Sequence, residues 1–283
     1  MRPALQLRNA SVTFGPRTLW AGLDLALDPG QLVAVLGPNG SGKTSLLRVI
    51  LGLTPLTAGS ITVGGRPVRR GNPRVGYIPQ HRGFGADLSM RGRDVVRLGI
   101  DGHRWGPPTP NRRIKARVDQ LLVEVGADGY GDEPVGRLSG GEQQRLRVAQ
   151  ALGNDPAVLL CDEPLLTLDL NHQRAVVDLI ERRRRLGTAV LFVTHEINPV
   201  IRHVDRVLYL VAGRFRLGTV EDVLTSATLT SLYGTPVEVI RAHDRLVVVG
   251  ADSPTDSHDE HPGHDPHGLT HERHNSRRFT GAA

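Results

Sequence analysis

Cysteine is nearly absent from this sequence. Cys161 is the one cysteine among 283 residues, so an intramolecular disulfide is excluded and nothing indicates an oxidising compartment. Because Cys161 lies inside an apolar run, we expect it to pack as a small hydrophobic side chain. The fold must then be held by a buried core, for which a chain of this length is sufficient.

Long apolar runs are missing as well. No stretch approaches the roughly 20 apolar residues that a membrane-spanning helix needs, and residues 1–6 lack the apolar core of a signal peptide. We therefore expect a cytoplasmic protein, which another protein must hold if it works at a membrane. Apolar residues are also scarce after Gly250, where Asp, His, Pro, Gly and Ser predominate. Residues 251–283 are therefore predicted to be a disordered tail.

A strong charge of one sign is absent too. The net charge is +6, from 35 basic and 29 acidic residues. This balance permits contact with nucleotides, acidic membrane surfaces or nucleic acid, and it decides among none of them. Part of the basic surplus lies in the short runs Arg69–Arg70, Arg112–Arg113 and Arg182–Arg185. We interpret these runs as solvated faces of helices or loops.

A glycine-rich stretch lies between two apolar segments. The run 32–36 predicts a buried strand, and residues 45–51 predict an amphipathic helix. In such a unit, backbone N–H groups and the positive end of the helix dipole bind phosphate. Lys43 would reach the outer phosphates and the Thr44 hydroxyl would ligate Mg²⁺. The predicted phosphate-binding loop and the first residue after it are Gly37, Pro38, Asn39, Gly40, Ser41, Gly42, Lys43, Thr44 and Ser45.

Strands and helices alternate over most of the chain. Period-two patterns predict strands over 5–13 and 19–27, and shorter apolar runs predict strands over 60–63, 74–79, 157–161 and 189–193. Helices are expected over 93–99, 114–125, 141–152 and 173–185, and hairpins within 206–217 and 236–250. We infer an α/β core with a mostly parallel sheet and a helical insertion from about residue 81 to 137.

A second motif follows the insertion. Residues 138–146 read Leu-Ser-Gly-Gly-Glu-Gln-Gln-Arg-Leu, and alone the Ser-Gly-Gly segment could form an ordinary helix N-cap. Combined with the phosphate-binding loop, the motif resembles the signature sequence of ATP-binding-cassette (ABC) ATPases. Further matches to this family are the run 158–163 as its second nucleotide motif, Gln80 as its lid-arm glutamine, Asp169 as its D-loop aspartate and His195 as its switch histidine.

The resemblance covers roughly residues 3–220 and implies the ABC ATPase fold. That fold is a P-loop nucleotide hydrolase core with a mostly parallel sheet, an antiparallel β subdomain and an α-helical insertion. We expect an ABC ATPase domain over 3–220 with the insertion at about 81–137, a C-terminal extension over 221–250 and the tail over 251–283. Phe14 matches the position where the family stacks an aromatic ring on adenine, with a core phenylalanine as the alternative. Leu166–Thr167 departs from the small residues that usually precede the D-loop aspartate.

The resemblance also implies which residues handle ATP and Mg²⁺. Asp162 ends a buried strand and would hold Mg²⁺ or its water shell together with Thr44, and Gln80 would contact the ion or a water. Glu163 projects differently from Asp162 and is the candidate general base for an attacking water. His195 would bind the terminal phosphate or that water.

In this family the signature loop acts on the ATP held by a second copy. The resemblance implies a head-to-tail dimer in which Ser139, Gly140 and Gly141 of one copy cap the γ-phosphate bound by Lys43 of the other. Asp169 belongs to the same nucleotide-binding set. ATP would then join the two copies, and hydrolysis would require the dimer.

A single cassette without a membrane span resembles the ATPase subunit of a bacterial importer. The resemblance implies an integral-membrane permease, an extracytoplasmic solute-binding protein and a place on the cytoplasmic face of the cell membrane. The runs 94–99 and 232–234 are most similar to importers of the zinc/manganese type. Transport of an iron-chelate or another small solute is one alternative. A soluble ABC ATPase acting on nucleic acid or ribosomes is less favoured, because long coiled coils and a second phosphate loop are missing, so no nucleic-acid partner is expected.

The tail carries side chains that bind metal ions. Imidazole and carboxylate groups suit Zn²⁺, and at this spacing they could chelate it without a preformed fold. A merely solubilising tail and low-complexity drift are the alternatives. The histidines of this predicted zinc contact are His258, His261, His264, His267, His271 and His274.

Overall fold

The structure, a computed structural model, describes residues 2–80, 83–85, 87–102, 111–243 and 245–250. Its strands are β1 (Leu5–Phe14), β2 (Arg17–Leu27), β3 (Leu32–Leu36), β4 (Ala58–Val63), β5 (Arg66–Pro67), β6 (Val75–Ile78), β7 (Val158–Asp162), β8 (Ala189–Val193), β9 (Arg206–Val211), β10 (Arg214–Gly218), β11 (Glu238–Ala242) and β12 (Arg245–Val249). Its helices are α1 (Lys43–Ile50), α2 (Gly92–Asp101), α3 (Arg112–Val125), α4 (Gly140–Ala151), α5 (Leu170–Arg185), α6 (Val220–Val223) and α7 (Ser226–Tyr233), with 3₁₀ turns at Val135–Arg137 and Ile201–His203.

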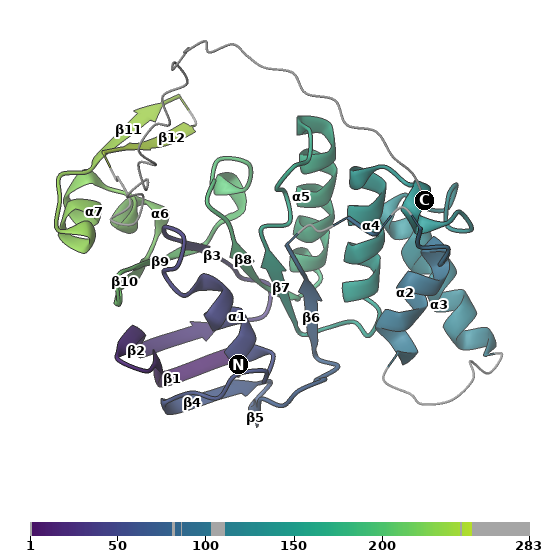
Figure 1. The fold of residues 1–283 in the computed structure, drawn as a ribbon, viewed down its shortest axis with the longest axis horizontal. Coiled ribbons are helices and arrows are strands. Elements are labelled where there is room, and N and C mark those ends of the chain that lie inside the picture. The colour runs from purple at the N-terminus through teal and green to yellow at the C-terminus, as the bar shows by residue number, and fades with distance from the viewer. Residues whose placement is uncertain (1, 81–82, 86, 103–110, 244, 251–283) are drawn as a thin grey trace, which may run out of the picture. The chain divides into compact units, whose positions relative to one another are not determined.

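The central sheet has six strands in the order β10-β9-β3-β8-β7-β6 (Figure 1). Its strands pair in parallel, except that β10 returns antiparallel beside β9. Every residue of β3, β7 and β8 is buried, because both faces of the sheet are covered. The predicted α/β core with a mostly parallel sheet is therefore confirmed.

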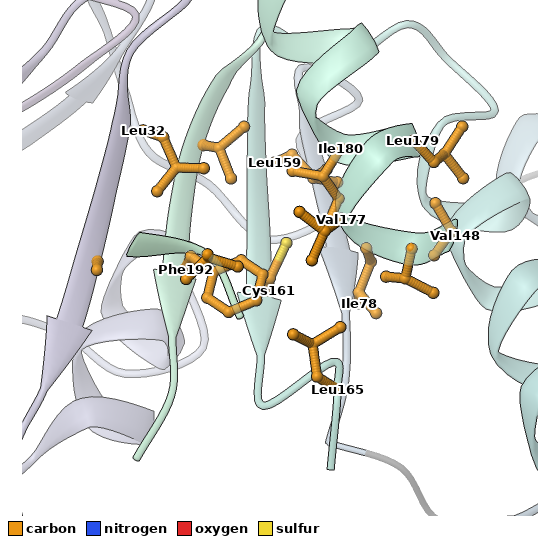
Figure 2. Close-up of a cluster of buried hydrophobic side chains, with 14 of the residues drawn as sticks. Leu32, Ile78, Val148, Leu159, Cys161, Leu165, Val177, Leu179, Ile180 and Phe192 are labelled. Atoms are coloured by element: carbon orange, nitrogen blue, oxygen red, sulfur yellow. The ribbon is translucent and has the colours of Figure 1, made fainter. Parts of the chain in front are cut away.

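Alternate residues of these strands contribute to two different cores, as the period of two along a strand requires. On one face Leu159, Cys161 and Phe192 pack with side chains of α4 and α5, which Figure 2 shows. On the other face Leu160 and Leu191 pack with α1 and with the second sheet. Cys161 is fully buried, so its predicted role as a small hydrophobic side chain is confirmed.

The second sheet is antiparallel, with strands in the order β2-β1-β4-β5. It corresponds to the antiparallel β subdomain that the resemblance implies. Its apolar side chains, such as Leu5, Leu23 and Val63, share one core with Leu46 and Leu47 of α1. The helix that follows the phosphate-binding loop is thereby held between the two sheets.

The helical part of the chain is formed by α2, α3 and α4. The first two lie in the predicted insertion, and α4 packs against both of them. Gly99 of α2 allows this close packing, because a Cβ there would lie 2.0 Å from the carbonyl oxygen of Gln150 in α4. The N-terminal residues of α4 therefore belong to a packed group of three helices, α2, α3 and α4, at one end of the sheet.

The C-terminal elements belong to the same core as the central sheet. Leu224, Leu229 and Leu246 are buried in the cluster that also holds Phe192. Asn198 ties the β11–β12 hairpin to this core, because its side chain bonds to both backbone groups of Leu246. Within the described ranges, we find no helix that combines the length and the apolar character needed to cross a membrane.

The arginine run at the end of α5 is not a solvated face throughout. The Arg183 side chain is only 10% exposed and donates to Glu124 of α3 at 2.6 Å and to Asp155 at 3.2 Å. Arg184 is half-buried and ion-paired as well. The interpretation as a solvated face is therefore wrong for these two residues, since Arg183 binds Glu124 and Asp155, and Arg184 binds Glu181 in its own helix and Asp205 at 3.5 Å.

Glu181 is the centre of an ion cluster in the same helix. Its buried carboxylate accepts hydrogen bonds from Arg184 at 2.7 and 3.0 Å and from Arg185 at 2.9 Å, and His203 Nδ1 lies 3.5 Å away. The hydrogen bonds from Arg184 are the main cause that lowers the pKa of Glu181 from 4.5 to about 2. Because the folded state lowers this pKa, ionised Glu181 stabilises the fold above about pH 4.5, and the stabilisation is lost as the pH falls through about 2.

We expect Glu181→Gln to lower the free energy of unfolding at neutral pH by about 1–3 kcal/mol, because a neutral amide replaces the buried carboxylate that accepts hydrogen bonds from Arg184 and Arg185. The difference from the parent should narrow as the pH falls below 4.5. Urea unfolding of both proteins at neutral and acidic pH measures this, with exposed Glu238→Gln as the control. A difference that does not change with pH would contradict the assignment.

Candidate active site

The phosphate-binding loop connects β3 to α1. The strand ends at Leu36 and the helix begins at Lys43. Gly37 has a φ of 139°, and a Cβ there would lie 2.1 Å from the carbonyl oxygen of Leu210 in β9. Only glycine allows this close approach, so the loop can turn tightly over the end of the sheet.

Two buried polar side chains of the loop are suited to an anion. Lys43 Nζ donates to the carbonyl oxygens of Gly37 at 2.6 Å and Pro38 at 2.9 Å, and the Ser41 hydroxyl is buried without a hydrogen-bond partner. Burial lowers the pKa of Lys43, against the opposing charges of nearby carboxylates. A phosphate group would pair with the ammonium group and accept a hydrogen bond from Ser41, so the loop fits the phosphates of ATP.

Asp162 lies beside this loop at the end of β7. Burial raises its pKa, although the Tyr77 hydroxyl, which donates to Asp162 Oδ2 at 3.3 Å, and Lys43 act in the opposite direction. Burial and Asp162 together raise the pKa of Tyr77 to about 12, so Tyr77 keeps its proton and remains a donor. A cation would favour the ionised form of Asp162, and its carboxylate and the Thr44 hydroxyl are oxygen ligands of the kind that Mg²⁺ prefers. These residues therefore fit Mg²⁺.

Glu163 is bracketed by two polar side chains. Gln80 Nε2 donates to Glu163 Oε2 at 3.2 Å, and His195 Nδ1 lies 3.4 Å from the same oxygen. The three residues follow β6, β7 and β8, which are neighbours in the parallel sheet. Since the carboxyl ends of parallel strands meet at one edge, the topology brings together residues from positions 80, 163 and 195. Glu163 itself has a φ of 47°, an uncommon conformation for a residue other than glycine.

A cavity of about 280 Å³ adjoins the phosphate-binding loop and Glu163, and its described lining does not include His195. Residues of the phosphate-binding loop and α1 line it on one side, and Gln80, Asp162 and Glu163 line it on the other, together with Phe14 and Leu19. Phe14 is 51% exposed, so the alternative of a core phenylalanine is wrong. Its ring is accessible for stacking on a base.

The signature residues lie elsewhere. Ser139 is the N-cap of α4 and forms a capping box with Glu142, and Gly140 and Gly141 open the helix. No described residue that lines the phosphate-loop cavity belongs to 139–141. In Figure 1, β7 and β6 lie between α1 and α4. The chain therefore does not bring its signature residues to its own phosphate-binding loop.

Asp169 is not at the cavity either. It is the N-cap of α5, and its Oδ1 accepts hydrogen bonds from the backbone of Asn171 and His172, both at 2.9 Å. Thr167, in the segment that departs from the family pattern, has a φ of 68°. The carboxylate of Asp169 is 64% exposed, which leaves it accessible from outside the chain.

Three side chains at these positions were not found from the sequence. Tyr77 binds Asp162, Arg17 donates to the Gly40 carbonyl oxygen at 2.8 Å, and His172 Nδ1 lies 2.7 Å from Asp169 Oδ2. The sequence did contain a signal for the contact of His172, because a histidine three residues after an N-cap aspartate can reach its carboxylate. The contacts of Tyr77 and Arg17 depend on strand register and on loop packing, for which the sequence has no local pattern.

The predicted tail histidines lie outside the described residues. Among the residues that the structure does describe, no group of three or more His, Cys, Asp or Glu side chains is arranged to hold a metal ion.

A parallel sheet with a phosphate-binding loop, an aspartate and a glutamate at one edge defines a P-loop ATPase that uses ATP with Mg²⁺. The family profile described as ABC transporter matches residues 20–166. The chain belongs to the ABC transporter family and is an ATP-hydrolysing subunit of that family. The predicted family and the predicted enzyme class are thereby confirmed.

Individual relatives cover most of the chain. The zinc import ATP-binding protein ZnuC of Yersinia pestis bv. Antiqua is 37% identical over 270 residues, which are 95% of each chain. The manganese transport system ATP-binding protein MntB of Halalkalibacterium halodurans is 30% identical over 249 residues, 88% of this chain and 99% of that one. The ADP conformation of MJ1267, an ATP-binding cassette of an ABC transporter, superposes with a TM-score of 0.71 at 19% identity over 82% of this chain and 99% of that one, which shows the shared fold.

Proposed function

We propose that this chain hydrolyses ATP to drive the import of a divalent metal ion such as zinc or manganese. It would act with an integral-membrane permease and an extracytoplasmic solute-binding protein, and the permease would hold it at the cytoplasmic face of the cell membrane. The names of relatives that align with 95% and 88% of the chain support this cargo. Neither of these two names supports an iron-chelate, nucleic acid or the ribosome as the cargo or partner.

The observation that carries the catalytic assignment is the position of the Glu163 carboxylate, with Gln80 and His195 at 3.2 and 3.4 Å from one oxygen. Glu163 would accept the proton of the attacking water, and Gln80 and His195 would orient that water and the terminal phosphate. Lys43 would bind the outer phosphates. Mg²⁺, held by Thr44 and Asp162 with Gln80 nearby, would neutralise charge on the phosphates.

The position of the signature residues supports a site shared by two copies. Gly140 and Gly141 lie in the first turn of α4, where backbone N–H groups have no acceptor within the helix and suit an anion. They lie away from the phosphate loop of their own chain, so the anion would be the γ-phosphate on Lys43 of a second copy. Ser139 and Asp169 would contact that second copy as well, and Phe14 would stack on the adenine of the ATP that its own chain holds.

Reconstitution tests the cargo. The chain is assembled with its permease and solute-binding protein in lipid vesicles, and uptake of radiolabelled zinc, manganese and an iron-chelate is compared with and without ATP. We expect ATP-dependent uptake of zinc or manganese, which Glu163→Gln abolishes. Uptake of the iron-chelate alone would contradict the proposed cargo and leave the ATPase assignment intact.

The tail gives a separate prediction. We expect the assembled transporter to change its ATPase rate when zinc is added on the cytoplasmic side, because the six tail histidines and neighbouring carboxylates would bind the ion. Deletion of residues 251–283 should remove this response, and replacement of the six histidines by asparagine should do the same at unchanged length. Identical zinc responses of the parent and both variants would rule out a sensing role.

A further inference from the structure

His172 lies between the N-terminal ends of two helices. It belongs to the first turn of α5, and its ring abuts Gly141 in the first turn of α4. A Cβ at Gly141 would lie 2.1 Å from His172 Cδ2 and 2.5 Å from Nε2. The missing side chain at this signature position therefore leaves the space that the imidazole occupies, and any larger residue would displace the ring.

The same ring holds the carboxylate of Asp169. Two backbone N–H groups occupy Oδ1, and His172 Nδ1 lies 2.7 Å from Oδ2. The hydrogen bonds from His172 lower the pKa of Asp169, so the carboxylate is ionised at neutral pH and the ring nitrogen is the donor. An N-cap needs only the backbone hydrogen bonds. The additional bond from the ring fixes the orientation of the second oxygen.

A second contact connects the same two parts of the chain. Gln144 of α4 donates from Nε2 to the carbonyl oxygen of Pro164 at 2.9 Å, in a buried position. Pro164 directly follows Glu163. Helix α4 is thus joined to residues 164–169 at both ends of that segment, through Gln144 at the beginning and through His172 at the end.

We propose that His172 is a positioning residue for ATP hydrolysis. It joins residues 164–169 to the signature residues 139–141, so that both segments keep one fixed geometry toward the ATP and the phosphate-binding loop of the second copy. This role rests on the proposed head-to-tail site. The His172 side chain is 34% exposed, and the contacts described above run to Asp169 and Gly141 rather than to the phosphate-loop cavity of its own chain.

The first test compares His172→Ala with His172→Asn in the full chain. We expect His172→Ala to lower kcat at least roughly tenfold, because displacements of about 1 Å at a reacting centre are costly. Binding of an ATP analogue, measured by equilibrium dialysis, should stay within about twofold of the parent, since the loop that binds it is unchanged. His172→Asn should recover most of kcat, because its amide nitrogen can take the place of Nδ1. His243→Asn, on the exposed hairpin, is the matched control and should behave like the parent.

A second test uses the contact with Gly141. Gly141→Ala should be more harmful when His172 is present, because the added methyl group meets the ring. The double variant Gly141→Ala/His172→Ala should therefore lose less activity than the product of the two single losses. Multiplicative losses, or a kcat of His172→Ala within twofold of the parent, would overturn the proposal. Failure of the proposed shared site would give a different result: the parent would then hydrolyse ATP at full rate as an isolated monomer.

Discussion

Replacement of Glu163 by glutamine is expected to reduce ATP turnover by about 10²- to 10⁴-fold, the range for loss of a general base. An amide has nearly the same size as the carboxylate and can still hydrogen-bond to Gln80 and His195, so the cavity should keep its shape. It cannot accept a proton from the attacking water. ATP binding should therefore persist while hydrolysis stops, and an ATP-bound dimer should accumulate.

Two measurements check this expectation. Single-turnover hydrolysis with radiolabelled ATP reports the chemical step, and size-exclusion chromatography with light scattering in Mg²⁺ and ATP reports the dimer. Glu238→Gln makes the same chemical change on the exposed β11 strand and should leave both readouts at parental values. Turnover of Glu163→Gln near the parental rate would show that another group is the base.

Replacement of Lys43 by alanine should weaken the binding of ATP rather than the hydrolysis step. The ammonium group is buried beside the loop, and a charge-assisted hydrogen bond of this kind contributes about 1.5–3 kcal/mol. We therefore expect the affinity for ATP to fall roughly 10- to 100-fold. The variant should form no ATP-bound dimer at ATP concentrations that saturate the parent.

Equilibrium dialysis with labelled ATP measures this affinity directly. Lys115 is the other lysine of the chain and is exposed on α3, so Lys115→Ala is a matched control with unchanged affinity. The two site variants together separate binding from chemistry. Equal ATP affinities of Lys43→Ala and the parent would place the phosphates somewhere other than the loop.

The sequence was sufficient to predict those parts of the site that lie within one contiguous segment or at the ends of predicted strands. The phosphate-binding loop is one contiguous segment between a buried strand and a helix, so its position could be predicted from residues 32–51 alone. Gln80, Glu163 and His195 are far apart along the chain, yet each lies within two residues of the end of a predicted strand. A parallel sheet places such residues at one edge, which is why their proximity could also be expected.

Other contacts depend on packing that no local pattern encodes. Arg183 stands in a run of four arginines, and only the approach of α3 turns it into a buried partner of Glu124. Tyr77 reaches Asp162 because β6 pairs in one particular register with β7. The ring of His172 meets Gly141 because two helix ends converge. These contacts follow from the relative placement of elements, and the sequence pattern alone predicts the elements.

The central claim is that each ATP lies between Lys43 of one copy and the signature residues of the other. Mixed dimers with two affinity tags test it, with Glu163→Gln in every chain so that ATP is trapped. In one mixed dimer, Lys43→Ala is on one copy and Ser139→Arg is on the other. In the second mixed dimer, both substitutions are on the same copy and its partner is otherwise unchanged.

The decisive measurement is the amount of labelled ATP that each purified mixed dimer retains. Our account predicts retention when the substitutions are on different copies, because one pairing of Lys43 with Ser139 then stays intact. It predicts loss when they are on the same copy, because both pairings are then damaged. Retention only in the dimer whose substitutions share one copy would mean that each chain encloses its own ATP, and would contradict the account.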